Sequence, residues 1–547
     1  MPKPTPDLRT SNVHLDVQKW SNLQGLQEQA QKYWGLRRIQ PYFPSIQKLF
    51  KLENVRMPYH YGLKLRAPIQ TIGAETIYAA GKEVSVHLKK TMLYSPYRVM
   101  HGEYAGTGLP NTDDVSAEPL RIQSPYNAAY VGSLASLVLS ESECKHFPVV
   151  YGVFSGIAEK HVLDISDDYE DLCDRPWFSQ NIGHFFDLRL RKPEVPVLQF
   201  AEVNPEVIDL GAVDIEPLAI PTPPPAAILG LGYDGDTEET PEEMGESDSC
   251  STDYIFGVRS AASDSEDDED GDDGDDSDSE ETGDGFSEDE HDEPFAHAIF
   301  KDAPIQITVM EKCDGTLYTL FKENPETEKR CAWLAQVIFA LAYAQRTFAF
   351  VHNDLHVMNV MHVPTTAEFF YYNVGGKSYR VPTFGKLIKI IDFDRASFSV
   401  KVPKLKDSKF FMSDQFHQDE EAGGQYNIAP FYNAKYPEIK PNPSFDLVRL
   451  ATSMFWDCFP SGPDEKYVSN PIFKMFMAWL TLPDGKSVLF RDPENGDFSE
   501  RYRGFHLYKA IARYCRDTAV PRKQIEKFGA VYITDKVPRG EACLVIE

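Results

Sequence analysis

The chain has 547 residues, enough for two or three compact units, and a formal net charge of −29. Residues 234–293 hold 28 of the acidic side chains and one basic side chain, so the rest of the chain is nearly neutral. The sequence contains no Lys/Arg-rich run, no apolar run of about 18 residues, no secretory leader and no C-x-x-C pair. These features give no support for direct nucleic-acid binding, a membrane span, secretion or a zinc ribbon, and they favour an intracellular soluble protein.

Residues 1–58 are expected to form an N-terminal helical extension. Apolar side chains at helical spacing predict an amphipathic helix over residues 17–36, and a second, short helix is expected over residues 43–50. Both helices are interpreted as packing extensions rather than functional segments.

The region that follows is predicted to be rich in β-structure. Residues 72–78 and 83–90 each have the composition of a strand, and a turn is expected between them at Gly81. Apolar residues recur at helical spacing over residues 125–140, which predicts a helix. A further strand is expected to start at Phe147.

Two insertions are predicted next. Aromatic and apolar side chains in residues 154–232 favour an ordered insertion. Residues 234–294 are acidic and too poor in apolar side chains to offset the entropy lost on ordering, so they are predicted to be disordered. This acidic segment is interpreted as a solvated loop, a docking tail for basic proteins such as histones, or a phosphorylation tract with acceptors at Ser263, Ser265, Ser277 and Ser287.

The most informative stretch follows the clearest helix of the chain. Residues 304–310 have the pattern of a buried strand, and residues 326–348 carry an apolar stripe that predicts a long helix. A second apolar run, residues 387–391, leads into Asp392-Phe393-Asp394. The helix itself leads into the segment Phe350-Val351-His352-Asn353-Asp354-Leu355-His356-Val357-Met358-Asn359-Val360-Met361.

These two segments carry the side chains that phosphoryl transfer from a magnesium nucleotide requires. One carboxylate, at Asp354, accepts a proton from the attacking hydroxyl or orients it. An amide at Asn359 and a second carboxylate at Asp392 hold the metal ion on the phosphates. Each piece is short and has a high false-positive rate by itself. Their order and the elements that flank them make the combination specific.

The order H-x-D-L-x-x-x-N followed by D-F-x resembles the catalytic and metal loops of protein kinases. Between the two loops, residues 369–374 and 378–381 flank a Gly-Gly-Lys turn and predict a hairpin. Further matches occur at Asp354-Leu355-His356, Gly376-Lys377, Pro382, Gly385 and Ile390-Ile391-Asp392. With these residues the chain resembles haspin-type atypical kinases and the kinase-like proteins of large DNA viruses.

The resemblance implies an α+β, two-lobed protein-kinase-like fold with the acidic insertion. The β-rich small lobe would span residues 59–310, including both insertions, and the mainly helical large lobe would span residues 311–547. A helix expected over residues 441–451 would lie beneath the catalytic loop, and its Asp446 would bond to the loop backbone. The compartment would be the cytoplasm or the nucleus, or the virion if the protein is viral.

The resemblance also assigns roles in the catalytic loop and the metal loop. Asp354 would be the catalytic base, and Asn359 and Asp392 would hold Mg²⁺. His356 would stand in the catalytic loop where serine/threonine kinases often have a lysine, as it does in haspin-type kinases.

Contacts to ATP are implied at Lys89, Gly73, Met310, Glu311 and Cys313. Lys89 would reach the α- and β-phosphates, although Lys90 offers equal chemistry. Gly73 is the single glycine near the expected glycine-rich loop. Met310 would gate the adenine pocket, and the backbone that follows it would read the adenine edge.

The implied activity is that of an ATP-dependent protein serine/threonine kinase acting on a protein hydroxyl. Three departures from the kinase pattern favour a pseudokinase or virion-type scaffold instead: the single glycine Gly73, the lack of an acid in residues 125–140 before Glu141, and Asp394 in place of the glycine of D-F-G. A small-molecule phosphotransferase related to aminoglycoside or choline kinases is a further, less favoured alternative.

Overall fold

The computed structural model describes residues 15–41, 43–52, 54–104, 108–110, 122–166, 168–191, 296–400 and 408–547. Apart from Arg191, these residues belong to one compact unit that is formed by residues 1–190 and 254–547. This unit combines several sheets with many helices, so the α+β class expected from the sequence is confirmed. The acidic segment, residues 234–294, and residues 192–232 of the expected ordered insertion lie outside the described residues.

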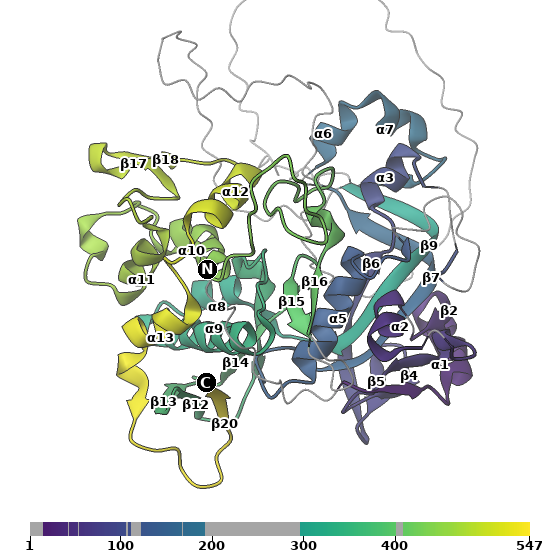
Figure 1. Ribbon diagram of the computed structural model, residues 1–547, viewed down its shortest axis with the longest axis horizontal. Coiled ribbons are helices and arrows are strands. Elements are labelled where there is room, and N and C mark those ends of the chain that lie inside the picture. Colours follow the sequence, from purple (N-terminus) through teal and green to yellow (C-terminus); the bar gives the residue numbers. More distant parts are fainter. Residues whose placement is uncertain are drawn as a thin grey trace, which may run out of the picture. The chain divides into compact units, whose positions relative to one another are not determined.

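The largest sheet has seven antiparallel strands (Figure 1). Its order is β2 (Leu36–Gln40), β7 (Val150–Asp164), β9 (Ala296–Glu311), β6 (Lys82–Met92), β5 (Thr76–Ala79) and β4 (Ile69–Ile72), and β8 (Asp187–Leu190) also pairs with β9. Leu190 pairs with Ala296, so the two sheet strands on either side of residues 192–295 are neighbours at this point. A strand rises about 3.3 Å per residue, which puts this point about 50 Å along β9 from Glu311.

The expected helix over residues 17–36 is shorter than the sequence pattern predicts. Strand β1 (Val17–Lys19) pairs with β3 (Tyr61–Leu63), and α1 (Leu23–Trp34) begins only after it. Gly35 ends the helix because its φ of 62° is the left-handed conformation that glycine adopts without strain. The short helix expected over residues 43–50 is confirmed as α2 (Pro44–Phe50).

The expected strand over residues 72–78 is also broken. The chain turns between β4 and β5, and the N–H of Gly73 donates to the carbonyl of Thr76 at 2.8 Å. The physical reason is that a tight turn of polar and small residues separates two apolar positions, Ile72 and Ile77, which both lie in the core. The turn around Gly81 and the strand over residues 83–90 are confirmed, the latter as part of β6.

Helix α5 (Ala128–Ser140) confirms the helix expected over residues 125–140. The side chain of Asn127 caps it by accepting the N–H of Ala129 at 3.1 Å. Its residues from Ala129 onwards are all buried, because the helix contacts β7 and β9 on one side and shares a hydrophobic cluster with the C-terminal helices on the other (Figure 1). Three short helices accompany the sheet: α3 (Pro96–His101), α6 (Tyr169–Cys173) and α7 (Pro176–Asn181).

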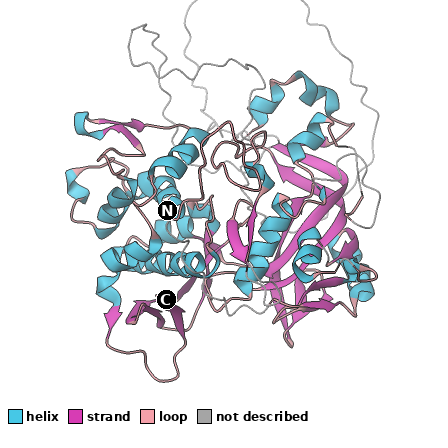
Figure 2. Ribbon diagram, viewed as in Figure 1, coloured by secondary structure: helices cyan, strands magenta, loops and turns pink. Residues whose placement is uncertain are grey.

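The described residues that follow β9 combine helices with short strands, drawn as cyan and magenta ribbons in Figure 2. The long helix expected over residues 326–348 is confirmed as α9 (Thr327–Phe348), and the helix expected near 441–451 begins at Phe445. The other helices of this part are α8 (Leu317–Glu323), α10 (Phe445–Cys458), α11 (Pro471–Leu480), α12 (Phe505–Tyr514) and α13 (Pro521–Phe528).

Short strands connect these helices. Strands β10 (Gly315–Thr316), β11 (Val360–Pro364) and β14 (Lys386–Ile390) form one sheet, and two hairpins are β15 (Ser397–Val400) with β16 (Lys409–Met412) and β17 (Phe490–Asp492) with β18 (Asp497–Glu500). The hairpin expected around Gly375 and Gly376 is confirmed: β12 (Phe369–Val374) pairs with β13 (Lys377–Pro382), and both glycines have positive φ. The C-terminal strands β19 (Ile533–Thr534) and β20 (Cys543–Ile546) complete this sheet.

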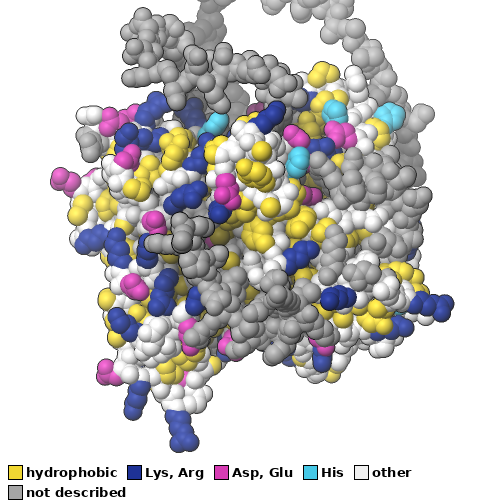
Figure 3. Space-filling view, in the orientation of Figure 1, with side chains coloured by type: hydrophobic (Ala, Val, Ile, Leu, Met, Phe, Trp, Pro, Cys, Tyr) yellow, Lys and Arg dark blue, Asp and Glu magenta, His cyan; other side chains and the backbone are white. Residues whose placement is uncertain are grey.

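On the face drawn in Figure 3, Lys and Arg side chains occur singly or in small groups between acidic and apolar side chains. No single basic patch dominates that face. Among the helices of the described residues, none has both the length and the apolar character that crossing a bilayer requires.

Candidate active site

The segment with the H-x-D motif leaves the end of α9 and is fixed from below by α10. Ala349 ends α9 in the left-handed conformation, and the motif begins three residues later at His352. The fully buried carboxylate of Asp446 accepts the backbone N–H groups of His352 and Asn353, each at 3.0 Å. These are the bonds to the loop backbone that the sequence predicts for Asp446, and they hold the loop by charge-assisted hydrogen bonds.

Asp446→Ala is expected to lower the free energy of unfolding by about 3 kcal/mol, because two buried N–H groups lose their acceptor. Urea unfolding followed by circular dichroism measures this change. Asp457→Ala, an exposed acid near the end of the same helix, is the matched control and should change stability by less than about 0.5 kcal/mol. A loss at position 446 as small as that of the control would contradict the bracing role.

The carboxylate of Asp354 is held between a tyrosine and an arginine. Its Oδ1 accepts the hydroxyl of Tyr508, on α12, at 2.7 Å, and its Oδ2 lies 3.7 Å from Nη1 of Arg395. Burial by itself would raise the pKa of Asp354, but the neighbouring charges, that of Arg395 foremost, outweigh it and hold the pKa below its ordinary value. Asp354 is therefore ionised at neutral pH and can accept a hydrogen bond from a hydroxyl.

Tyr508 was not anticipated from the sequence, because it lies 154 positions after Asp354 in a helix without a motif. Burial raises the pKa of Tyr508 to about 12, so its hydroxyl remains a donor at neutral pH. Nε of Arg449 donates in turn to this hydroxyl at 2.9 Å. The phenol therefore occupies one oxygen of the candidate base.

Asn359 and His356 lie against the same loop. Nδ2 of Asn359 is 3.0 Å from the carbonyl of Asp354 and 3.0 Å from Nε2 of His356. Because Nδ2 can only donate, Nε2 of His356 accepts and the imidazole is neutral; burial lowers its pKa to about 4 accordingly. These bonds fix the amide of Asn359 and leave its oxygen as the atom suited to a cation.

The register of two strands brings Asp392 beside Asn359. Val360 of β11 pairs with Ile390 of β14, and the N–H of Ile391 donates to the carbonyl of Asn359 at 3.0 Å. Nε2 of His352 lies 2.7 Å from the carbonyl of Ile391. Asp392 follows with a φ of 63°, an uncommon conformation for a residue other than glycine. The two segments that the sequence singled out thus converge at one place.

Lys89, and not Lys90, reaches this place from the large sheet. Nζ of Lys89 forms an ion pair with Asp392 and a second one, at 3.0 Å, with Oδ2 of Asp394. Successive side chains of a strand point to opposite faces, so Lys90 faces away. On that opposite face Lys90 lies near His161. Burial lowers the pKa of His161 to about 4, and the positive charge of Lys90 acts in the same direction.

Met310, Glu311 and Cys313 lie at the C-terminal end of β9 and just beyond it. Met310 is buried and pairs with His87 and Val150. Glu311 pairs at 2.8 Å with Lys389, a buried cation on β14 that the sequence did not single out. Burial raises the pKa of Cys313 to about 12, so its thiol is protonated. The ion pair between Glu311 and Lys389 joins the end of the large sheet to β14, the strand that leads to Asp392.

Gly73 lies in the turn between β4 and β5, where its hydrogen bond is to Thr76 of the same hairpin. Strand β5 pairs with β6, the strand of Lys89, through Thr76 and Ser85. Gly73 is therefore connected to the other candidate residues through the sheet register and not by a direct contact of its own among those described.

A second acid supports Arg395. Oε2 of Glu421 lies 3.6 Å from Nη2 of Arg395, which places Arg395 between Glu421 and Asp354. Burial raises the pKa of Glu421 to about 7, although the charge of Arg395 opposes the shift. The neighbouring Glu420 pairs with Arg98 of α3 at 2.6 Å.

Glu421→Gln is expected to stabilise the folded protein at pH 8 and to have little effect at pH 5. A carboxyl whose pKa rises on folding contributes stability that is complete below its ordinary pKa and is lost as the pH rises through about 7. Gln resembles the protonated carboxyl at every pH, so the gain at pH 8 reaches at most about 3 kcal/mol. Urea unfolding at pH 5, 6.5 and 8 measures it, and an effect independent of pH would contradict this assignment.

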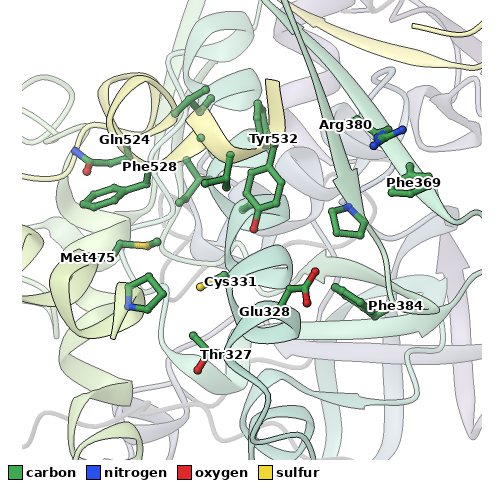
Figure 4. A pocket seen from close by; sticks show the side chains of 18 residues that line it. Thr327, Glu328, Cys331, Phe369, Arg380, Phe384, Met475, Gln524, Phe528 and Tyr532 are labelled. Carbon is green, nitrogen blue, oxygen red and sulfur yellow. The ribbon is translucent and has the colours of Figure 1, made fainter. Parts of the chain in front are cut away.

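A separate cavity of about 760 Å³ lies between α9, the hairpin β12–β13, α11 and the C-terminal residues near α13 (Figure 4). Its lining is mostly apolar and includes Phe369, Phe528 and Tyr532. None of the candidate residues described above lines it. It offers no carboxylate pair for a metal nucleotide and is distinct from the site at Asp354.

Comparisons with known proteins support a kinase-like protein but cover only part of the chain. No family model matches the chain. It is 24% identical over 229 residues to “Putative serine/threonine-protein kinase R400” of Acanthamoeba polyphaga mimivirus, which is 34% of this chain and 49% of that protein. It is 32% identical over 92 residues to “Serine/threonine-protein kinase haspin” of Bos taurus (16% and 12%) and 36% identical over 69 residues to “Uncharacterized protein ZK177.2” of Caenorhabditis elegans (12% and 23%).

The chain thus spans less than half of the length of each of these proteins. The names of two of them denote serine/threonine kinases, and the weak, partial similarity supports a kinase-like protein.

Proposed function

We propose that the chain is an ATP-dependent protein serine/threonine kinase with a two-lobed fold. The large sheet with α5 would form the small lobe, within residues 59–310, behind an N-terminal extension of residues 1–58. The helices from α8 onwards would form the large lobe, residues 311–547. The ion pair between Glu311 and Lys389 supports a junction between the lobes at the end of β9.

The observation that carries this proposal is the convergence of four residues, Lys89, Asp354, Asn359 and Asp392, from three separate parts of the sequence. The carbonyl of Asn359 accepts the N–H of Ile391, next to Asp392, and the amide of Asn359 donates to the backbone of Asp354. Lys89 reaches Asp392 from β6. A site for a magnesium nucleotide requires two carboxylates, an amide and a lysine at one place. The partly buried Lys89 and these polar side chains meet that requirement.

The donor set fits Mg²⁺ and ATP. The amide oxygen of Asn359 and the carboxylate of Asp392 are hard oxygen ligands, and Mg²⁺ commonly takes one or two such ligands together with phosphates. Bound magnesium ATP would supply the γ-phosphoryl group. Lys89 would contact the phosphates, the backbone near Glu311 and Cys313 would bind adenine behind Met310, and Gly73 would lie at the phosphate-covering turn.

In this mechanism Asp354 orients the substrate hydroxyl and accepts its proton. The carboxylate is ionised, and Arg395 holds it in place. The neutral His356 keeps the amide of Asn359 oriented toward the cation. Basic proteins are proposed substrates, since they would be attracted by the acidic segment; no nucleic acid or membrane is proposed as a partner.

The test is transfer of labelled phosphate from ATP to basic and acidic protein substrates. Purified protein is expected to transfer label with Mg²⁺ and to lose the activity when EDTA removes the metal, because the phosphates then lack their cation. If no label is transferred to any substrate or to the protein itself, the kinase proposal fails.

The pseudokinase or scaffold alternative is favoured by two contacts. The hydroxyl of Tyr508 donates to one carboxylate oxygen of Asp354, and Lys89 forms an ion pair with Asp392. Both carboxylates are therefore already engaged by the protein itself. A protein of this kind would show a magnesium-dependent thermal shift with ATP without transferring phosphate, or no thermal shift at all. Tyr508→Phe distinguishes a blocked base from an absent activity, since it would raise transfer only in the first case.

A further inference from the structure

Lys89 needs a carboxylate partner in the candidate site, because its side chain is only 14% exposed. In protein kinases the partner is a glutamate on the helix behind the site. Helix α5 occupies that position against β9 but contains no acid between Ala128 and Ser140. The first acid after the helix, Glu141, pairs with Arg66 at 3.4 Å.

The carboxylate that does meet Lys89 from the side of α5 belongs to Asp394. Its Oδ2 lies 3.0 Å from Nζ of Lys89 and accepts the hydroxyl of Thr91 at 3.2 Å. Its other oxygen points at α5. Thr91 and Lys89 are alternate residues of β6, so both contacts are on the same face of the strand.

The helix makes room for this carboxylate at Gly132. A Cβ at position 132 would overlap Oδ1 of Asp394 and would lie 3.0 Å from its Cγ and 3.1 Å from its Cα. A glycine inside a helix is unfavourable compared with alanine. Its presence in the middle of a fully buried helix is explained by the side chain that fills the space above it.

We propose that Asp394 is the positioning residue for Lys89, and that Gly132 and Asp394 together replace an acid on the helix and a glycine in the metal loop. Kinases usually carry the acid on the helix and the glycine in the metal loop. This chain carries the glycine on the helix, at Gly132, and the acid in the loop, at Asp394. Lys89 would stay aimed at the phosphates through Asp394 while Asp392 binds the cation. The catalytic part of this inference rests on the proposed function.

The exchange predicts a rescue. Binding of magnesium ADP is measured by calorimetry for the full chain as wild type, Asp394→Gly, Gly132→Glu and the double variant. Each single variant is expected to weaken binding by about tenfold or more, through loss of the partner or through crowding of two acids. The double variant restores one acid and one glycine, and is expected to bind within about threefold of wild type.

The steady-state constants give a second measure. A positioning role predicts that Asp394→Gly raises KM for ATP more than it lowers kcat, and that the double variant reverses this change. Thr91→Val is the matched control, because it removes the uncharged hydroxyl that donates to Asp394 and leaves the ion pair in place. A double variant that binds as weakly as Asp394→Gly alone would overturn the proposal.

A test without nucleotide separates this inference from the proposed function. Gly→Ala inside a helix normally raises the melting temperature, but Gly132→Ala is expected to lower it by several degrees because the new methyl group displaces Asp394. In the Asp394→Gly background the same substitution is expected to raise it. If wild type binds no nucleotide, the proposed function fails while this reversal still supports the pairing; the same sign in both backgrounds overturns the pairing.

Discussion

Asp354→Asn is expected to lower the rate of phosphate transfer by about 10³-fold while binding of magnesium ATP stays within about threefold of wild type. The substitution keeps the size of the side chain and an oxygen that can accept the hydroxyl of Tyr508. It removes the negative charge that attracts the proton of the substrate hydroxyl. The substitution therefore slows the transfer of phosphate and leaves the affinity for the nucleotide nearly unchanged.

Single-turnover transfer of labelled phosphate and calorimetry of nucleotide binding measure the two quantities separately. Asp497→Asn is the matched control, since Asp497 lies on β18 and bonds to Ser499 of the same strand. It should leave both quantities unchanged. Near-normal transfer by Asp354→Asn would show that this carboxylate is not the base.

Asp392→Asn is expected to show the opposite pattern. The carboxylate is the only charged ligand proposed for the cation, so its neutralisation should weaken magnesium-dependent nucleotide binding by at least about tenfold and abolish detectable transfer. The fold should survive, because Lys89 keeps its ion pair with Asp394. The thermal shift with magnesium ATP should disappear while the melting temperature without ligand changes little.

Comparison of this shift with and without EDTA identifies the metal-dependent part. In wild type and in Asp354→Asn the shift should depend on Mg²⁺, and in Asp392→Asn it should not. If Asp392→Asn retains the full metal-dependent shift, the cation is held elsewhere and the proposed site is wrong.

Several elements could be predicted from local sequence because their residues meet at short range. The hairpin of β12 and β13 follows from alternating aromatic and β-branched residues around Gly375 and Gly376. Helix α9 follows from an apolar stripe with a period of 3.6 residues. The bracing by Asp446 followed from its place in a recognisable segment. The strand Val17–Lys19 and the turn at Gly73 were missed, since apolar spacing registers neither the pairing of a strand with a distant one nor a single turn residue.

The spacing of Asp354, Asn359 and Asp392 can be read from the sequence alone, and it predicted which two segments the fold brings together. The choice of Lys89 over Lys90 depends on which face of β6 meets Asp392, and that is set by strand pairing. Tyr508, Glu421 and the fit of Asp394 against Gly132 depend on contacts between elements up to hundreds of positions apart. Such contacts arise only when the core packs, because burial and charge pairing are properties of the assembled fold and not of a local sequence pattern.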